Sequence, residues 1–222
     1  AYPFYHQLCC TYELNLRFIP MNERLWRIEN YEEFLEVRRN LIAKNINDYL
    51  DSLIIEPEEV KEKSVEELIP LGESISLEFK SSLQWDVREN KLNKRLRHSV
   101  LKTIAAFLNT EGGILIIGVE DNGNVYGLEC DYSTTENSKD KYLNLLNTLI
   151  GDYVGLDVTP YICINIEKID DKDICEIRVE KSHKPVFMQS DSHEKTLYIR
   201  RGTTTHALDP EETHFYIETN WG

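Results

Sequence analysis

An apolar run at residues 114–119, Ile-Leu-Ile-Ile-Gly-Val, constrains this chain more than any other segment. Consecutive apolar residues in a strand must be covered on both faces, which is typical of strands inside layered α/β structures. The glycine pair Gly112-Gly113 precedes the run, and helical periodicity covers residues 92–108 before it. The sequence therefore predicts a buried strand that lies against at least one helix.

Strand and helix patterns alternate after residue 72. Residues 74–80 alternate apolar and polar side chains, which predicts a half-buried strand. Asp121–Asn124 and Asp170–Asp173 have the composition of turns. Further strands are predicted at 125–128, 161–166, 174–179, 186–189 and 196–200, and further helices at 139–150 and 211–219. We expect an α+β fold, a mixed β-sheet with flanking helices.

The first 70 residues follow a different pattern. Asn30 and Glu33 resemble a capping box, and apolar residues then recur at helical spacing from Phe34 to Leu53. Pro70-Leu71-Gly72 closes this region. We predict a helical N-terminal extension at 1–70, which could be the tail of another domain, and an α+β domain at 71–222.

Charge is distributed unevenly along the 222 residues. The formal net charge of −14 argues against indiscriminate nucleic-acid coating and against docking on an anionic membrane. However, residues 80–102 hold seven Lys and Arg against two acids. The apolar runs are too short to span a membrane. Five cysteines without a C-x-x-C pair indicate reduced thiols, and hence a cytoplasmic protein.

Acidic side chains and one lysine surround the first predicted strand. Glu78 and Lys80 share one strand face, and Glu73 precedes them. Two carboxylates with a lysine can hold a divalent cation and neutralise charge on a phosphate. A solvated strand face shows the same alternation, so this alternative stays open.

Asp121 follows the buried strand at its carboxyl end, where functional groups gather in open α/β sheets. An Asp before Asn-Gly is also ordinary turn chemistry, and that alternative stays open as well.

Basic residues form two candidate phosphate contacts. The predicted helix carries one stripe, and the segment Tyr198–His206 adds two arginines among threonines. Such side chains can hold phosphates. However, the stripe could equally be a solvated helix face, and the later segment could be an ordinary strand followed by a turn, so both alternatives stay open. No phosphate loop of the G-x-x-x-x-G-K-[ST] type occurs, so no nucleotide cofactor is expected. The residues are Lys91, Lys94, Arg95, His98 and Lys102 in the stripe, with Arg200 and Arg201 in the later segment.

Three motifs in order resemble the Schlafen-type AlbA domain, over residues 70–221. They are Leu71–Lys80, Thr103–Asp121 and Gly123–Gly127, and Pro185–Phe187 and Tyr198–Gly202 fit the tail of the family. The resemblance implies a nucleic-acid-processing function, with a metal-dependent endoribonuclease acting on structured RNA such as tRNA as the leading interpretation. A non-catalytic DNA- or RNA-binding module of a larger regulatory or defence protein is the alternative.

The resemblance also assigns roles to individual residues. It places the three metal-binding carboxylates of the family on Glu73, Glu78 and Asp121, and its lysine on Lys80, so Mg²⁺ or Mn²⁺ is the expected cofactor. The zinc ligands of Schlafen proteins are not reproduced, so no zinc site is expected. Because eukaryotic Schlafens join two such lobes around RNA and this chain has one, a homodimer is implied.

Overall fold

The computed structural model describes Arg39 and residues 63–221. The chain divides into a unit of residues 1–52 and a unit of residues 53–222, and the fold below belongs to the second unit. The predicted helical extension lies almost entirely outside the described residues. The boundary between residues 70 and 71 stays a prediction, although Val65 and Leu68 pack in the core of the second unit.

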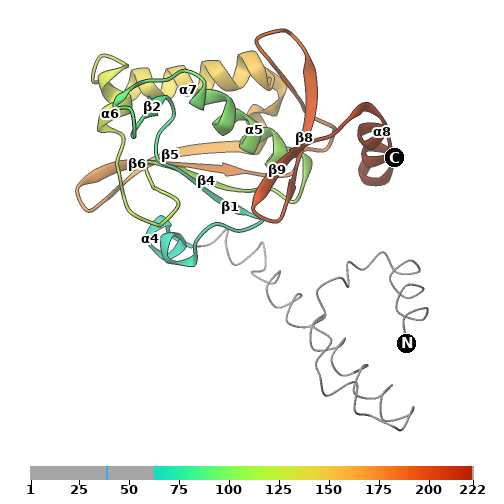
Figure 1. Ribbon diagram of the computed structural model, residues 1–222, viewed down its shortest axis with the longest axis horizontal. Coiled ribbons are helices and arrows are strands. Elements are labelled where there is room, and N and C mark those ends of the chain that lie inside the picture. Colours follow the sequence, from blue (N-terminus) through green and yellow to red (C-terminus); the bar gives the residue numbers. More distant parts are fainter. Residues whose placement is uncertain (1–38, 40–62, 222) are drawn as a thin grey trace. The chain divides into compact units, whose positions relative to one another are not determined.

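A four-stranded mixed sheet lies at the centre of the second unit (Figure 1). Its order is β1 (Leu77–Lys80), β4 (Gly113–Ile117), β6 (Lys172–Val179) and β5 (Ile162–Ile169). β1 and β4 are parallel, whereas β6 is antiparallel to both of its neighbours. The predicted α+β class with a mixed sheet is therefore confirmed.

Helices cover the two faces of this sheet, as the apolar run predicts. α5 (Leu96–Asn109) and α7 (Lys139–Tyr153) lie on one face, and the short α4 (Val65–Leu68) lies on the other with the 3-10 turn η3 (Ile69–Leu71) (Figure 1). The larger core fills the space under α5 and α7, and a smaller one lies under α4. β4 contributes Leu115 and Ile117 to the first core and Ile114 and Ile116 to the second.

A second sheet crosses over α5. It has the order β7 (Phe187–Gln189), β8 (Lys195–Arg201) and β9 (Thr204–Ala207), and α8 (Pro210–Trp221) follows it. The sequence pattern did not predict β9, because its residues Thr-Thr-His-Ala lack an apolar alternation and are largely exposed. This second sheet brings β8 to the side of α5 that faces β1.

Two predicted elements differ from the structure. The helix predicted from residue 92 begins at Leu96, because residues before it pair in a hairpin of β2 (Trp85–Asp86) and β3 (Lys91–Leu92). The strand predicted at 125–128 is reduced to one bridge between Val119 and Val125. Two short helical elements were also missed, α6 (Glu129–Ser133) and η4 (Leu156–Tyr161).

The glycine pair before β4 permits a close approach of α5 and β6. Gly112 has a φ of +82°, and a Cβ there would lie 2.5 Å from the carbonyl oxygen of Val179. A Cβ on Gly113 would lie 2.5 Å from the ring of Phe107. A larger residue at Gly112 would therefore collide with the backbone of β6, and one at Gly113 would displace the Phe107 ring of α5. Among the described residues, no helix combines the length and apolar character needed to cross a membrane.

Candidate functional site

Glu78 lies on the buried face of β1, under α5. Leu77 and Phe79 belong to the smaller core, so the alternation of the strand turns Glu78 and Lys80 toward the opposite face. Glu78 is only 8% exposed. The open alternative of a solvated strand face therefore does not describe this strand, because α5 and β8 cover it.

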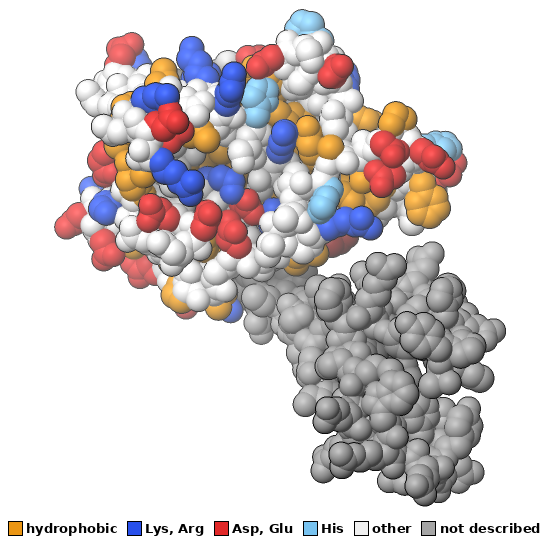
Figure 2. Space-filling model, in the orientation of Figure 1, with side chains coloured by type: hydrophobic (Ala, Val, Ile, Leu, Met, Phe, Trp, Pro, Cys, Tyr) orange, Lys and Arg blue, Asp and Glu red, His pale blue; other side chains and the backbone are white. Residues whose placement is uncertain are grey.

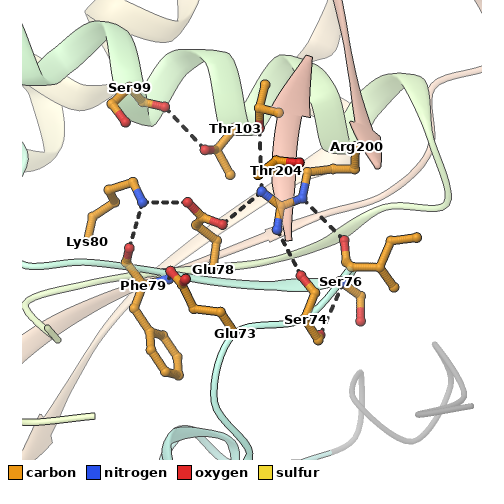
Figure 3. Close-up of polar contacts among 12 residues, drawn as sticks. Glu73, Ser74, Ser76, Glu78, Phe79, Lys80, Ser99, Thr103, Arg200 and Thr204 are labelled. Carbon is orange, nitrogen blue, oxygen red and sulfur yellow. Dashed lines mark hydrogen bonds and ion pairs between the residues drawn. The ribbon is translucent and has the colours of Figure 1, made fainter. Parts of the chain in front are cut away.

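Arg200 and Lys80 neutralise this buried carboxylate from two sides (Figure 3). The Arg200 Nη1 lies 2.8 Å from the Glu78 Oε2, and the Lys80 Nζ forms an ion pair with the Glu78 Oε1. Arg200 also donates a 2.8 Å hydrogen bond to the carbonyl oxygen of Ser74, and its guanidinium lies 5.2 Å from the centre of the Phe107 ring. Each oxygen of Glu78 is thus engaged by a cationic side chain.

The other two predicted metal ligands do not join Glu78. The Glu73 carboxylate accepts a 3.1 Å hydrogen bond from the backbone N–H of Phe79. Asp121 is exposed in the turn after β4. In the part of the chain that the structure describes, no three His, Cys, Asp or Glu side chains gather closely enough to hold a metal ion.

The side chains in this arrangement do not fit the predicted three-carboxylate Mg²⁺ or Mn²⁺ centre. Such a cation needs several oxygen ligands that converge on one point. Here Glu78 is held between two cations, Glu73 is held by backbone and Asp121 faces solvent. The arrangement instead holds β8 against β1 through a buried ion pair.

Arg200 differs from its predicted role as a phosphate contact. Its side chain is 1% exposed, and its donors bond to the protein itself. The neighbouring Arg201 is exposed, as a phosphate contact would need to be. The strand alternation of β8 explains the difference, because adjacent residues point to opposite faces.

Asn109, the last residue of α5, fixes β8 in the position that this ion pair needs. Its side-chain amide donates to the carbonyl oxygens of Val186 at 2.8 Å and Tyr198 at 2.9 Å. Its side-chain oxygen accepts a 2.8 Å hydrogen bond from the Val186 N–H. Asn109 is completely buried, so these backbone groups have no solvent to replace it.

We expect Asn109→Ala to lower the free energy of unfolding by about 2–3 kcal/mol, because it leaves buried backbone groups without partners. Asn147→Ala is the matched control, since the Asn147 side chain is exposed and donates to the Leu143 carbonyl within its own helix. Urea unfolding of the two variants measures the difference. Equal midpoints would contradict the role of Asn109.

The predicted basic stripe divides between two elements. Lys91 lies on β3, where it forms an ion pair with Glu89, and not on the helix. Lys94 and Arg95 immediately precede α5, and His98 and Lys102 follow on its first two turns. The Lys102 Nζ lies 5.5 Å from the centre of the Tyr198 ring. Lys94, Arg95, His98 and Lys102 are called the basic ridge below.

A pocket of about 250 Å³ opens at the start of the basic ridge. Leu101, Tyr153 and Asp191 line it together with residues around the first turn of α5, namely Lys94, Arg95, Arg97 and His98. Figure 2 shows basic side chains over the part of the surface that the β2–β3 hairpin and α5 occupy, with acidic side chains among them. Sequence reasoning missed Tyr153 and Asp191, because they lie more than 50 residues after the stripe.

Asp191 accepts hydrogen bonds from two sides of this pocket. The Tyr153 hydroxyl donates to the Asp191 Oδ1 at 2.7 Å, and the His98 Nε2 lies 3.1 Å from its Oδ2. Hydrogen bonds from Tyr153 and then His98 lower the pKa of the Asp191 carboxyl. The same bond raises the pKa of Tyr153. The carboxylate of Asp191 is therefore stabilised in its charged form.

A buried network supports Arg97 from behind. Asp131 accepts backbone hydrogen bonds from Leu83 at 2.7 Å and Gln84 at 3.0 Å, which orders the segment after β1. The Gln84 side-chain oxygen then accepts a 2.8 Å hydrogen bond from the Arg97 Nε. Burial raises the pKa of Asp131 and lowers that of Arg97. The sequence around Asp131 contains no motif that would indicate this role.

The family model described as "Schlafen, AlbA_2" matches residues 73–209, which is more than half of the chain. The chain belongs to the Schlafen AlbA_2 family. This membership confirms the resemblance drawn from the three motifs and associates the domain with nucleic-acid-related function. The matched range contains β1, α5, the pocket and β8.

Two solved structures are similar to this Schlafen AlbA_2 domain. The DIP2311 protein from Corynebacterium diphtheriae is 21% identical, with a TM-score of 0.47 over 78% of this chain and 33% of that chain. The N-terminal domain of a RecG-related protein from Nitrosomonas europaea is 19% identical, with a TM-score of 0.36 over 61% of this chain and 84% of that chain. This chain thus spans a third of the length of the first of them.

Proposed function

We propose that this domain binds the phosphate backbone of nucleic acid through the basic ridge, with structured RNA preferred over DNA. The observation that carries the proposal is the pocket at the start of α5, where cationic side chains converge on one surface. Lysine and arginine contacts to phosphates supply most of the affinity of such proteins, and they supply it without reading sequence.

The net charge of −14 is compatible with this proposal because the negative charge is not uniform. Residues 80–102 hold seven basic residues against two acids, and the basic ridge comes from this segment. A local positive surface on an acidic protein favours contact at one place and disfavours coating. We therefore propose a single nucleic-acid contact at the basic ridge, in a cytoplasmic protein.

A metal-dependent endoribonuclease is the second candidate. One observation favours it, since Glu78 and Lys80 share a strand face as the family's catalytic pair would. The separation of Glu73, Glu78 and Asp121 weighs against it. A homodimer that completes an RNA groove is part of the same candidate, and sedimentation of the full chain at several concentrations tests it.

We expect the full chain to bind a labelled tRNA with an affinity that falls as salt rises, and to leave the tRNA intact in Mn²⁺. Binding is measured by fluorescence anisotropy from 50 to 300 mM salt, and cleavage by denaturing gel. Absence of salt-dependent binding would contradict the proposed function.

Asp121→Asn separates the two candidates in the cleavage assay. Asp121 is exposed, so this variant keeps the fold, whereas Glu78 variants disturb a buried ion pair. Cleavage by the wild type that Asp121→Asn abolishes would establish the nuclease and overturn a purely binding role. Cleavage that persists in the variant at an unchanged rate would point to a contaminating nuclease.

A further inference from the structure

The geometry points to a phosphate-binding subsite in the pocket at the start of α5, whose donors Asp191 occupies in the free protein. The subsite would take one phosphate group of a nucleic acid, and it therefore rests on the proposed function. Asp191 would be a built-in competitor that the phosphate displaces.

Two hydrogen-bond donors in this pocket already converge on one anion. The Tyr153 hydroxyl and the His98 Nε2 contact different oxygens of the Asp191 carboxylate, at 2.7 and 3.1 Å. These donors come from the end of α7 and the first turn of α5, which are held together by an edge-to-face contact of the two rings at 5.3 Å. The pocket thus presents preformed donors to oxygens of an anionic group.

Positive charge is in surplus around the Asp191 carboxylate. Lys94, Arg95 and Arg97 line the same pocket, and Asp191 is the single acid among its lining residues. Lys94 and Arg95 are exposed, and neither has an ion pair with a residue between 63 and 221. One carboxylate does not balance the three cationic side chains, so the pocket keeps a positive charge. A phosphate would neutralise more of that charge than the carboxylate does.

The position of Asp191 in the fold allows its side chain to move out of the pocket. Its side chain is 72% exposed, and it stands at the tip of the loop between β7 and β8. Loop tips tolerate rearrangement far better than the helices that carry His98 and Tyr153. Phosphate oxygens could replace the carboxylate oxygens on the same donors without any change in α5 or α7.

We expect Asp191→Asn to tighten RNA binding about fivefold at 100 mM salt, because it removes a unit charge within contact distance of the bound phosphate. Glu194→Gln is the matched control, since it removes the same charge from the same loop outside the pocket lining. We expect at most about a twofold change for this control, from general electrostatics alone. Anisotropy titrations of both variants and the wild type measure the difference.

The chemical source of the phosphate is tested with two versions of one oligonucleotide, carrying a 5′-phosphate or a 5′-hydroxyl. A gain in Asp191→Asn with both versions indicates an internal phosphodiester, and a gain only with the first indicates a terminal phosphate; either supports the subsite. His98→Gln added to Asp191→Asn should remove the gain.

Two outcomes overturn the subsite, and they differ in what they say about the proposed function. If the wild type binds RNA, and Asp191→Asn and Glu194→Gln change the affinity equally, the subsite fails and the binding function stands. If the wild type shows no salt-dependent RNA binding and inorganic phosphate does not move the His98 imidazole NMR signals of Asp191→Asn, both fail.

Discussion

Replacing Arg200 by Met is expected to lower the free energy of unfolding by about 3–5 kcal/mol, the largest effect on stability that we predict for a single substitution. The guanidinium is almost completely buried and pairs with Glu78. Methionine fills much of the same volume but supplies no charge and no donor. Glu78 would then keep Lys80 as its remaining cationic partner, in a place where the glutamate is only 8% exposed.

The loss extends beyond the ion pair. Arg200 donates to the carbonyl oxygen of Ser74, so the segment that leads into β1 also loses a donor. The contact of the guanidinium with the Phe107 ring disappears as well. Because Glu78 and Arg200 are 122 residues apart in the chain, this cluster joins the two sheets through a long-range contact.

Arg201→Met is the matched control, since Arg201 is the exposed neighbour on the same strand and should change stability by no more than about 0.5 kcal/mol. Adding Glu78→Gln to Arg200→Met removes the buried carboxylate that has lost its arginine partner and should recover at least about 2 kcal/mol. Guanidinium chloride unfolding measures all four proteins. Equal losses for the two Met variants would show that the pair is not a stabilising contact.

Much of the central sheet could be predicted from sequence because its signals are local. The apolar run at Ile114–Ile117 and the alternation through Leu77 and Phe79 gave β4 and β1 within a few residues. The start of α5 could not be placed, since Leu92 continues the helical apolar pattern but pairs with Trp85 in a hairpin. Periodicity alone does not report such a pairing.

The site was less predictable because its partners are distant in sequence. The alternation of its strand identified Glu78 as a candidate site residue. Its role, however, depends on the ion pair with Arg200, which the sequence indicated as a phosphate contact on the surface. Asp191 and Tyr153 carried no motif at all. A burial pattern predicts which face of a strand is covered, but not which side chain from another sheet covers it.

Replacing both Lys94 and Arg95 by Gln is expected to weaken RNA binding about 25- to 60-fold at 0.1 M salt. Each phosphate contact contributes a slope of about 0.7 to 0.9 in log K against log salt, so two lost contacts reduce the slope by about 1.4 to 1.8. Because 1 M to 0.1 M salt is one decade, this change in slope corresponds to a loss of about 1.4 to 1.8 units in log K at 0.1 M salt, which is the stated fold-change. Anisotropy titrations at four salt concentrations give the slope directly.

The matched control for this pair is Lys139→Gln with Lys168→Gln, which removes the same net charge elsewhere. Both lysines are exposed, and Lys139 lies at the opposite end of α7 from Tyr153, about 21 Å along the helix. A surface contact at the basic ridge predicts an unchanged slope for this control, because it neutralises no phosphate there. If the two double variants lost the same slope, the binding would depend on net charge alone, and the basic ridge would not be the place where nucleic acid docks.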